Sequence, residues 1–206
     1  MNQILYFHRV YPLAIFERRK WFNLVVNVLR SPPLNLYLEL SVSDFLRVLL
    51  QNDGVNAFSV VLYDSRFNAD LERYSVKLNM FPRMEVSREK IDTILAGTTI
   101  DDEPEIRLPG FDWTEIYSQF RLFLYRFQNE LKRTKGEVKS GQDADNDADA
   151  NIFYRLTVDT AADLTGNTNW VRLATGEGDI RTKITPLGEV DTGFLVFSMV
   201  REKVKP

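Results

Sequence analysis

The sequence predicts an α+β domain in which helices cover one face of an antiparallel sheet. Two long segments repeat apolar residues at three- and four-residue steps, as amphipathic helices do. Several shorter segments alternate apolar and polar residues, as half-buried strands do. The helical and strand-like segments also come in separate runs rather than in strict alternation, which favours antiparallel over parallel pairing.

The first two predicted helices lie before residue 54. Residues 2–11 form the end of an apolar helix, because Pro12 cannot donate a helical hydrogen bond and biases Tyr11 away from the helix. A second helix starts at Ser31, which two prolines follow, and ends near 52–54. Its apolar stripe consists of Leu34, Tyr37, Leu38, Phe45, Leu46 and Leu49.

The clearest amphipathic pattern in the chain follows Asp112, which forms a variant of the capping box with Glu115. The apolar residues behind this cap are Ile116, Phe120, Phe123, Leu124, Phe127 and Leu131. We expect this helix to end at Gly136, after cations in its last turn, as the helix dipole favours. The acidic segment of about 136–150 is then predicted to be a flexible loop.

The predicted strands are rich in β-branched and aromatic residues. Residues 55–63 and 73–80 form a hairpin around the polar segment DSRFNAD. Residues 82–110 are mixed in character and are expected to be a loop with one short helix. Further extended segments are expected at 152–158, 170–173, 183–187 and 193–200.

Composition excludes several classes of protein. The 206 residues fit one domain, and 44% hydrophobic with 27% charged residues is typical of a folded chain. The absence of cysteine excludes disulfides, zinc–thiolate sites and thiol nucleophiles. A net charge of −3 argues against broad nonspecific binding to nucleic acid, so a connection to DNA is expected to run through another protein. No apolar run could span a bilayer and no secretory signal is apparent, so we expect an intracellular chain.

The residues offer no catalytic constellation. The segment DADNDAD at 143–149 is spaced like the start of a calcium loop, but Ala148 and Tyr154 occupy the positions that require glycine and glutamate. His8 has apolar neighbours and no nucleophile to activate, which indicates a packed imidazole. We therefore expect no enzyme activity, no cofactor and no metal. A magnesium-dependent nuclease or nucleotide-handling enzyme is the alternative, although no paired-carboxylate motif supports it.

Binding to another protein is the class of function that remains. Aromatic residues such as Tyr37, Trp170, Phe194 and Phe197 are frequent at interface hot spots, but most aromatics in a domain of this size belong to its core. The basic cluster at 18–20 indicates a solvated turn or the rim of an interface.

A family resemblance enters at the N-terminal stretch LYFHRVYPLAIFERRKWFN, followed by SPPLNLYLEL. It resembles the HORMA-domain accessory subunit of DNA polymerase zeta, the mitotic arrest deficient 2-like protein 2 family, and we expect a fungal member. That family has an apolar helix end, Val-Tyr-Pro, Ile-Phe, a basic cluster, an asparagine and then Pro-x-Leu-Asn-x-Tyr. The matching residues are Val10, Tyr11, Pro12, Ile15, Phe16, Arg19, Lys20, Asn23, Pro32, Leu34, Asn35 and Tyr37.

The resemblance implies one HORMA domain over residues 1–206, with three helices on one face of an antiparallel sheet. It divides the chain into a core, residues 1–158, and a C-terminal safety belt, residues 159–206. The belt is expected to close over a proline-containing peptide of the catalytic subunit of DNA polymerase zeta. Because a partner strand gains main-chain hydrogen bonds at a sheet edge, this mode of binding requires no catalytic group.

The resemblance also implies roles for individual residues. Tyr37 and Trp170 match the contacts to the partner peptide. Ile184, Phe197 and Met199 match positions that dock the C-terminal domain of the deoxycytidyl-transferase scaffold polymerase. Arg121 and Arg18 match positions of a HORMA dimer interface.

The implied function is that of a nuclear, non-catalytic adaptor in translesion DNA synthesis, which touches DNA only indirectly and no membrane. The alternative within the HORMA proteins is a spindle-checkpoint type that binds a different closure peptide.

Overall fold

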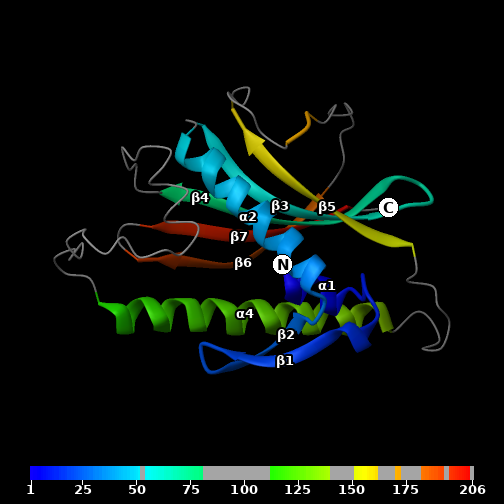
Figure 1. The fold of residues 1–206 in the computed structure, drawn as a ribbon, viewed down its shortest axis with the longest axis horizontal. Coiled ribbons are helices and arrows are strands. Elements are labelled where there is room, and N and C mark those ends of the chain that lie inside the picture. Colours follow the sequence, from blue (N-terminus) through cyan, green and yellow to red (C-terminus); the bar gives the residue numbers. More distant parts are fainter. Residues whose placement is uncertain are drawn as a thin grey trace.

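The computed structural model describes residues 1–51, 54–80, 112–139, 151–161, 170–172, 182–192 and 195–204. They form helices and strands in the order α1 (Asn2–Phe7), β1 (Phe16–Trp21), β2 (Leu24–Leu29), α2 (Pro32–Gln51), β3 (Val55–Asp64), β4 (Ala69–Met80), α4 (Trp113–Lys139), β5 (Ile152–Thr160), β6 (Thr182–Asp191) and β7 (Val196–Val204). Figure 1 shows their arrangement. Among the described residues, no helix is both long enough and apolar enough to cross a membrane.

Five strands form one antiparallel sheet in the order β5-β3-β4-β7-β6. The two C-terminal strands therefore extend the sheet on the β4 side, whereas β5 lies on the opposite edge. In Figure 1 the strands follow one another across the molecule, and α4 runs between β6 and the separate β1–β2 hairpin. This arrangement confirms the predicted α+β class with an antiparallel sheet.

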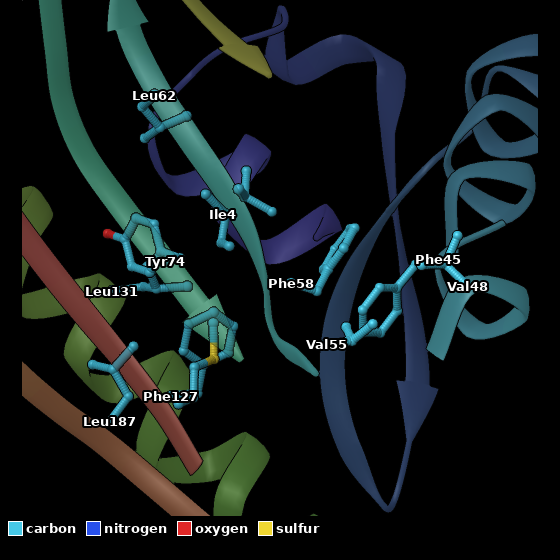
Figure 2. Packing of buried hydrophobic residues seen from close by; sticks show 12 residues of the cluster. Ile4, Phe45, Val48, Val55, Phe58, Leu62, Tyr74, Phe127, Leu131 and Leu187 are labelled. Atoms are coloured by element: carbon cyan, nitrogen blue, oxygen red, sulfur yellow. The ribbon is translucent and has the colours of Figure 1, made fainter. Parts of the chain in front are cut away.

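The three α-helices in the described part of the chain pack against the same face of the sheet. The strands contribute alternate side chains to this face, as the two-residue period of a strand requires. Figure 2 shows the resulting cluster from close by. Its buried residues are Ile4 of α1, Phe45 and Val48 of α2, Phe127 and Leu131 of α4, and Val55, Phe58, Val60, Leu62, Tyr74, Leu187 and Met199 of the sheet.

The first helix ends before Pro12, but at Phe7 rather than at the end of the predicted segment 2–11. Arg9 has a positive φ of 51°, and its N–H donates to the carbonyl of Tyr6. The N–H of Val10 donates to the carbonyl of Leu5, which completes a Schellman-type cap. Val10, Ile15 and Phe16 then pack against a second apolar cluster, whose buried members are Leu5, Leu29 and Leu38.

The β1–β2 hairpin is a feature that the sequence analysis does not predict. Phe22 and Asn23 form its two-residue turn, both with positive φ, of 50° and 57°. Such turns normally contain glycine, and this one has none, so the usual hairpin signal is missing. The cations of β1 also hide the alternation, because four of its six residues are exposed.

Helix α2 and strands β3, β4 and β5 agree with their predicted positions within a few residues, except that β4 begins earlier, at Ala69. Strand β6 is longer than predicted, and β7 begins three residues later than the predicted 193–200 segment and runs on to Val204. The predicted loop at 82–110 and most of the acidic segment lie outside the described residues.

Helix α4 starts as predicted but ends later. The side chain of Asp112 accepts a hydrogen bond from the N–H of Thr114 at 2.8 Å, so Asp112 is the N-cap. The predicted end at Gly136 is wrong, because the helix continues through it to Lys139. An interior glycine costs only about 1 kcal/mol relative to alanine, which a long, well-packed helix tolerates.

Candidate functional site

Strand β5 is one edge of the five-stranded sheet. Its backbone pairs with β3 from Ile152 to Thr160, and no described strand pairs with its other side. An edge strand carries a row of backbone N–H and C=O groups that another extended chain can pair with. The edge of β5 is therefore a place where a partner strand could add to the sheet.

The side chains of β5 that face the helices are only partly buried. These residues are Ile152, Tyr154, Leu156 and Val158, and all of them pack against the main cluster. Their neighbours on β3 are far less exposed, since Phe58, Val60 and Leu62 retain only 8%, 4% and 1% of their accessible surface. The edge strand thus keeps apolar surface that a further strand or side chain could cover.

Helix α2 carries one half-exposed aromatic side chain toward this edge. Leu38, Phe45 and Val48 are buried, which turns Leu36 and Leu40, each 55% exposed, to the outer side of the helix. Tyr37 lies at the flank of the buried stripe and is 50% exposed. An exposed aromatic group near an unpaired strand edge is typical of a binding surface rather than of a closed core.

Tyr37 and Tyr11 both lie close to Tyr154 of β5. The rings of Tyr11 and Tyr154 meet edge to face with centroids 6.2 Å apart. Burial raises the pKa of Tyr154, and a side-chain hydrogen bond with Tyr11 and the nearby Tyr37 raise it further. Three phenols from the N-terminal turn, α2 and β5 therefore gather at one end of the edge strand, although the sequence analysis singled out Tyr37 alone.

Trp170 lies near the other end of β5. Its ring packs edge to face on Phe58 with centroids 6.4 Å apart, and Phe58 in turn contacts Phe45 of α2. Phe58 pairs with Val158, whereas Tyr154 pairs with Leu62, so the two aromatic anchors are separated by four residues of β5, about 13 Å. The structure thus brings Tyr37 and Trp170 to the same strand.

The indole Nε1 of Trp170 is buried and has no hydrogen-bond acceptor in the described part of the chain. A buried N–H without a partner costs free energy that an incoming acceptor would recover. The backbone carbonyl of a bound peptide would provide such an acceptor.

Ile184, Phe197 and Met199, expected to share a docking surface, lie in different environments. Ile184 on the edge strand β6 is 59% exposed. Met199 is only 6% exposed and belongs to the main cluster, and Phe197 packs against Phe120 and Phe123 of α4 at 5.9 and 5.5 Å. Of the three, only Ile184 offers most of its side chain to a partner.

Arg18 and Arg121 are both exposed, on β1 and α4. These elements meet at the hairpin turn, where Phe22 stacks on Phe120 at 5.7 Å and contacts Tyr117 at 5.3 Å. The contact attaches the hairpin to the first half of α4.

A metal site would require several histidine or carboxylate side chains close together. The described residues contain no group of three or more His, Asp or Glu side chains that could hold a metal ion. His8 is a packed imidazole whose Nε2 lies 2.7 Å from the hydroxyl of Tyr74. The DADNDAD segment lies outside the described residues.

Comparison with curated proteins gives partial matches. The chain is 31% identical to the "Mitotic spindle assembly checkpoint protein MAD2B" of Gallus gallus over 91 residues, which is 44% of this chain and 42% of that protein. The Homo sapiens protein of the same name is 28% identical over the same share. The "DNA polymerase zeta processivity subunit" of Arabidopsis thaliana is 32% identical over 82 residues, 40% of this chain and 37% of that one. The match thus spans about two fifths of these relatives, and no protein-family model matches the chain.

Solved structures match over the whole chain. A protein in the "Crystal Structure of Mitotic Checkpoint Complex" aligns with a TM-score of 0.68 at 12% identity, covering 100% of this chain and 92% of that one. The C. elegans protein HTP-2, solved bound to a HIM-3 closure motif, aligns with a TM-score of 0.59 at 13% identity, covering 98% and 84%. The chain therefore has a HORMA-type fold and is related in sequence to the MAD2B proteins.

Proposed function

We propose that this protein is a non-catalytic adaptor subunit of DNA polymerase zeta in translesion DNA synthesis. It binds an extended, proline-containing peptide of the catalytic subunit along the free edge of β5. The chain after β5, residues 159–206, acts as a safety belt that encloses the peptide. The observation that carries this proposal is the only partly buried apolar row of β5, bordered by Tyr37 at one end and Trp170 at the other.

The position of the C-terminal strands supports a belt. Strand β5 lies at one edge of the sheet and β6 at the opposite edge, four strand spacings or roughly 19 Å away. The chain between them must therefore pass from one side of the sheet to the other, and Trp170 of this connection contacts Phe58 beside β5. We propose that this connection encloses a peptide on the edge of β5, which leaves only when the belt opens.

The relatives support the choice of partner. Similarity to a protein named as the processivity subunit of DNA polymerase zeta favours the polymerase, and HTP-2, with the same fold, was solved bound to a closure motif. The related MAD2B proteins carry a checkpoint name, which makes a spindle-checkpoint adaptor with a different closure peptide the second candidate. The polymerase function would place the protein in the nucleus.

The test is to measure the affinity of a proline-containing peptide from the catalytic subunit for the purified protein by calorimetry. Trp170→Ala should weaken binding by more than about 1 kcal/mol, or roughly fivefold in Kd, because it removes an aromatic anchor and a buried donor. Trp113→Ala is the matched control, because Trp113 is 74% exposed on α4 and lies on another element. Equal affinities of the Trp170→Ala variant and the unmodified protein would rule the site out.

A parallel titration with a checkpoint closure peptide separates the two candidates. A polymerase adaptor should prefer the polymerase peptide, and the reverse preference would support the checkpoint function.

Further partners follow from the same proposal. Ile184, together with Phe197 and Met199, is proposed to dock the C-terminal domain of the deoxycytidyl-transferase scaffold polymerase, with Ile184 as the directly accessible side chain. Arg121 and Arg18 are proposed to contribute to a HORMA dimer. A substitution of Ile184 by serine should weaken scaffold binding and leave peptide affinity unchanged, since β6 and β5 lie at opposite edges.

A further inference from the structure

A buried polar network joins β7 to α4, to β4 and to the end of α1. Arg201 of β7 is 5% exposed, and its Nη1 donates to the hydroxyl of Thr134 on α4. The same Nη1 lies 3.5 Å from the carboxylate of Glu130, one turn earlier on α4. On the other side, the Nε of Arg201 lies 3.9 Å from the carboxylate of Glu72 on β4.

Glu72 continues the network toward the N-terminus. It is 7% exposed and accepts a hydrogen bond from the hydroxyl of Tyr74 at 2.8 Å. Because that hydroxyl donates to Glu72, the Nε2 of His8, 2.7 Å away, donates its proton to the tyrosine oxygen. Burial and the adjacent Glu72 carboxylate raise the pKa of Tyr74, so the phenol stays a donor. We name these six residues, His8, Glu72, Tyr74, Glu130, Thr134 and Arg201, the Arg201 network.

The network lies where the C-terminal hairpin attaches to the rest of the domain. Strands β6 and β7 pair with each other, and β7 also pairs with β4, so the hairpin is held by the β4–β7 ladder and by α4. Arg201 pairs with Tyr74 across that ladder, and its guanidinium reaches both β4 and α4. To detach the hairpin, Arg201 must leave Glu72 and Glu130, both of which stay with the core.

Arg201 lies close to two carboxylates, but its guanidinium is not fully hydrogen-bonded. Its Nε is buried and has no hydrogen-bond acceptor among the described residues. A buried ion pair compensates for lost hydration only when its geometry is good and its remaining protons are bonded. This arrangement therefore favours the attached hairpin strongly over a state with unpaired carboxylates, yet it is less stabilising than a packed apolar contact would be.

We propose that the Arg201 network sets how readily the C-terminal hairpin detaches from β4 and α4. While Arg201 keeps its contacts, the hairpin stays attached. When these contacts are lost, the hairpin opens locally and the helical core stays folded. The consequence for partner retention rests on the proposed function, since opening of the hairpin would release a peptide held under the belt.

Hydrogen exchange of the free, full-length protein tests the control directly. In Arg201→Met the amides of β6 and β7 should exchange at least tenfold faster, whereas those at the centre of β3 should change by less than threefold. Ser198→Ala is the control, because Ser198 lies on the other face of β7, where its hydroxyl accepts a long 3.4 Å hydrogen bond from Asn79. An equal acceleration in β3 and in β6–β7, or none at all, would refute local control.

A single conservative variant covers the case in which Arg201→Met fails to fold. Glu72→Gln removes one carboxylate of the network and should by itself accelerate exchange in the hairpin more than at the centre of β3. Where Arg201→Met folds, its combination with Glu72→Gln should exchange more slowly in the hairpin than Arg201→Met alone, because no carboxylate on β4 then faces the lost cation. Additive effects of the two substitutions would contradict a shared network.

The peptide complex supplies a separate readout. If the proposed function holds, the peptide should dissociate at least tenfold faster from Arg201→Met than from the unmodified protein, with the Ser198→Ala control unchanged. If the unmodified protein binds no such peptide, the proposed function fails, but the exchange result still decides whether the network controls the hairpin.

Discussion

The two edges of the five-stranded sheet differ in how they are covered. At the β6 edge, Leu187 and Val190 are 5% and 0% exposed, and the strand packs against α4. At the β5 edge the helix-facing side chains remain partly exposed, and Tyr37 beside them is half exposed. Both edge strands have an unpaired backbone side among the described strands, but α4 covers the helix-facing side chains of β6, whereas those of β5 keep apolar surface beside aromatic side chains. An added strand therefore gains most at β5, where backbone pairing and apolar burial are both still available.

Alanine substitution of one leucine at each edge should produce the largest difference. Leu187→Ala removes a buried side chain of the main cluster and should lower the free energy of unfolding by about 2–4 kcal/mol. Leu156→Ala on β5 removes a partly buried side chain and should cost about 1 kcal/mol in the free protein. Urea denaturation of both variants measures the difference.

The same two variants respond differently to a partner. If a bound peptide covers β5, Leu156→Ala should weaken its binding, whereas Leu187→Ala should not change the affinity of the folded fraction. Equal stability losses at the two edges would show that β5 is already as well covered as β6.

Gly188 provides the next test, because it determines how closely β6 approaches α4. It has a φ of +147°, and a Cβ at this position would lie 3.2 Å from the ring of Phe123. Gly188→Ala should therefore lower the free energy of unfolding by about 1–3 kcal/mol, through backbone strain and the displaced ring. Thermal unfolding monitored by circular dichroism measures the loss.

The ring contribution can be separated from the backbone contribution. Phe123→Leu provides space at the contact, so Gly188→Ala should cost less in a Phe123→Leu background than alone. An identical loss of stability in both backgrounds would assign the whole effect to backbone strain. The close packing of β6 on α4 would then contribute nothing to it.

The difference between the edges could be predicted from the sequence only in part. The apolar stripe of α2 and the alternation of apolar and polar residues in β5 are local patterns. The place of Tyr37 on its helix and the existence of a half-buried strand at 152–158 therefore follow from the sequence. The contact between Trp170 and Phe58 joins residues more than a hundred positions apart, and no local pattern encodes it.

Register was the second quantity that the sequence left undetermined. Phe197 and Met199 alternate with Ser198, but which set faces the helices depends on the pairing of β7 with β4 and on the bulge between Pro186 and Gly188 of β6. A shift of one residue would reverse the facing of every side chain. The hairpin turn of Phe22 and Asn23 was missed for a related reason, since its positive φ values occur without glycine.

Alkaline pH should lower the free energy of unfolding through one tyrosine on β4 and one on β5, and this effect is the smallest of those predicted. Burial raises the pKa of Tyr74 on the β7 side and of Tyr154 on the β5 side above the ordinary value of about 10. A raised pKa in the folded state means that the unfolded chain loses its tyrosine protons first. Stability is therefore independent of these groups below pH 10 and falls as pH rises above it.

The loss should extend to a higher pH for the more buried phenol. Between pH 10 and its own folded-state pKa, each phenol should contribute up to about 1.4 kcal/mol per pH unit, and Tyr74, which is 1% exposed, should keep contributing to a higher pH than Tyr154. Free energies of unfolding from pH 9 upward for Tyr74→Phe and Tyr154→Phe measure each contribution against the unmodified protein. A bound peptide that covers β5 should extend the loss from Tyr154 alone to higher pH, and an unchanged pH range in the complex would place the peptide away from this edge.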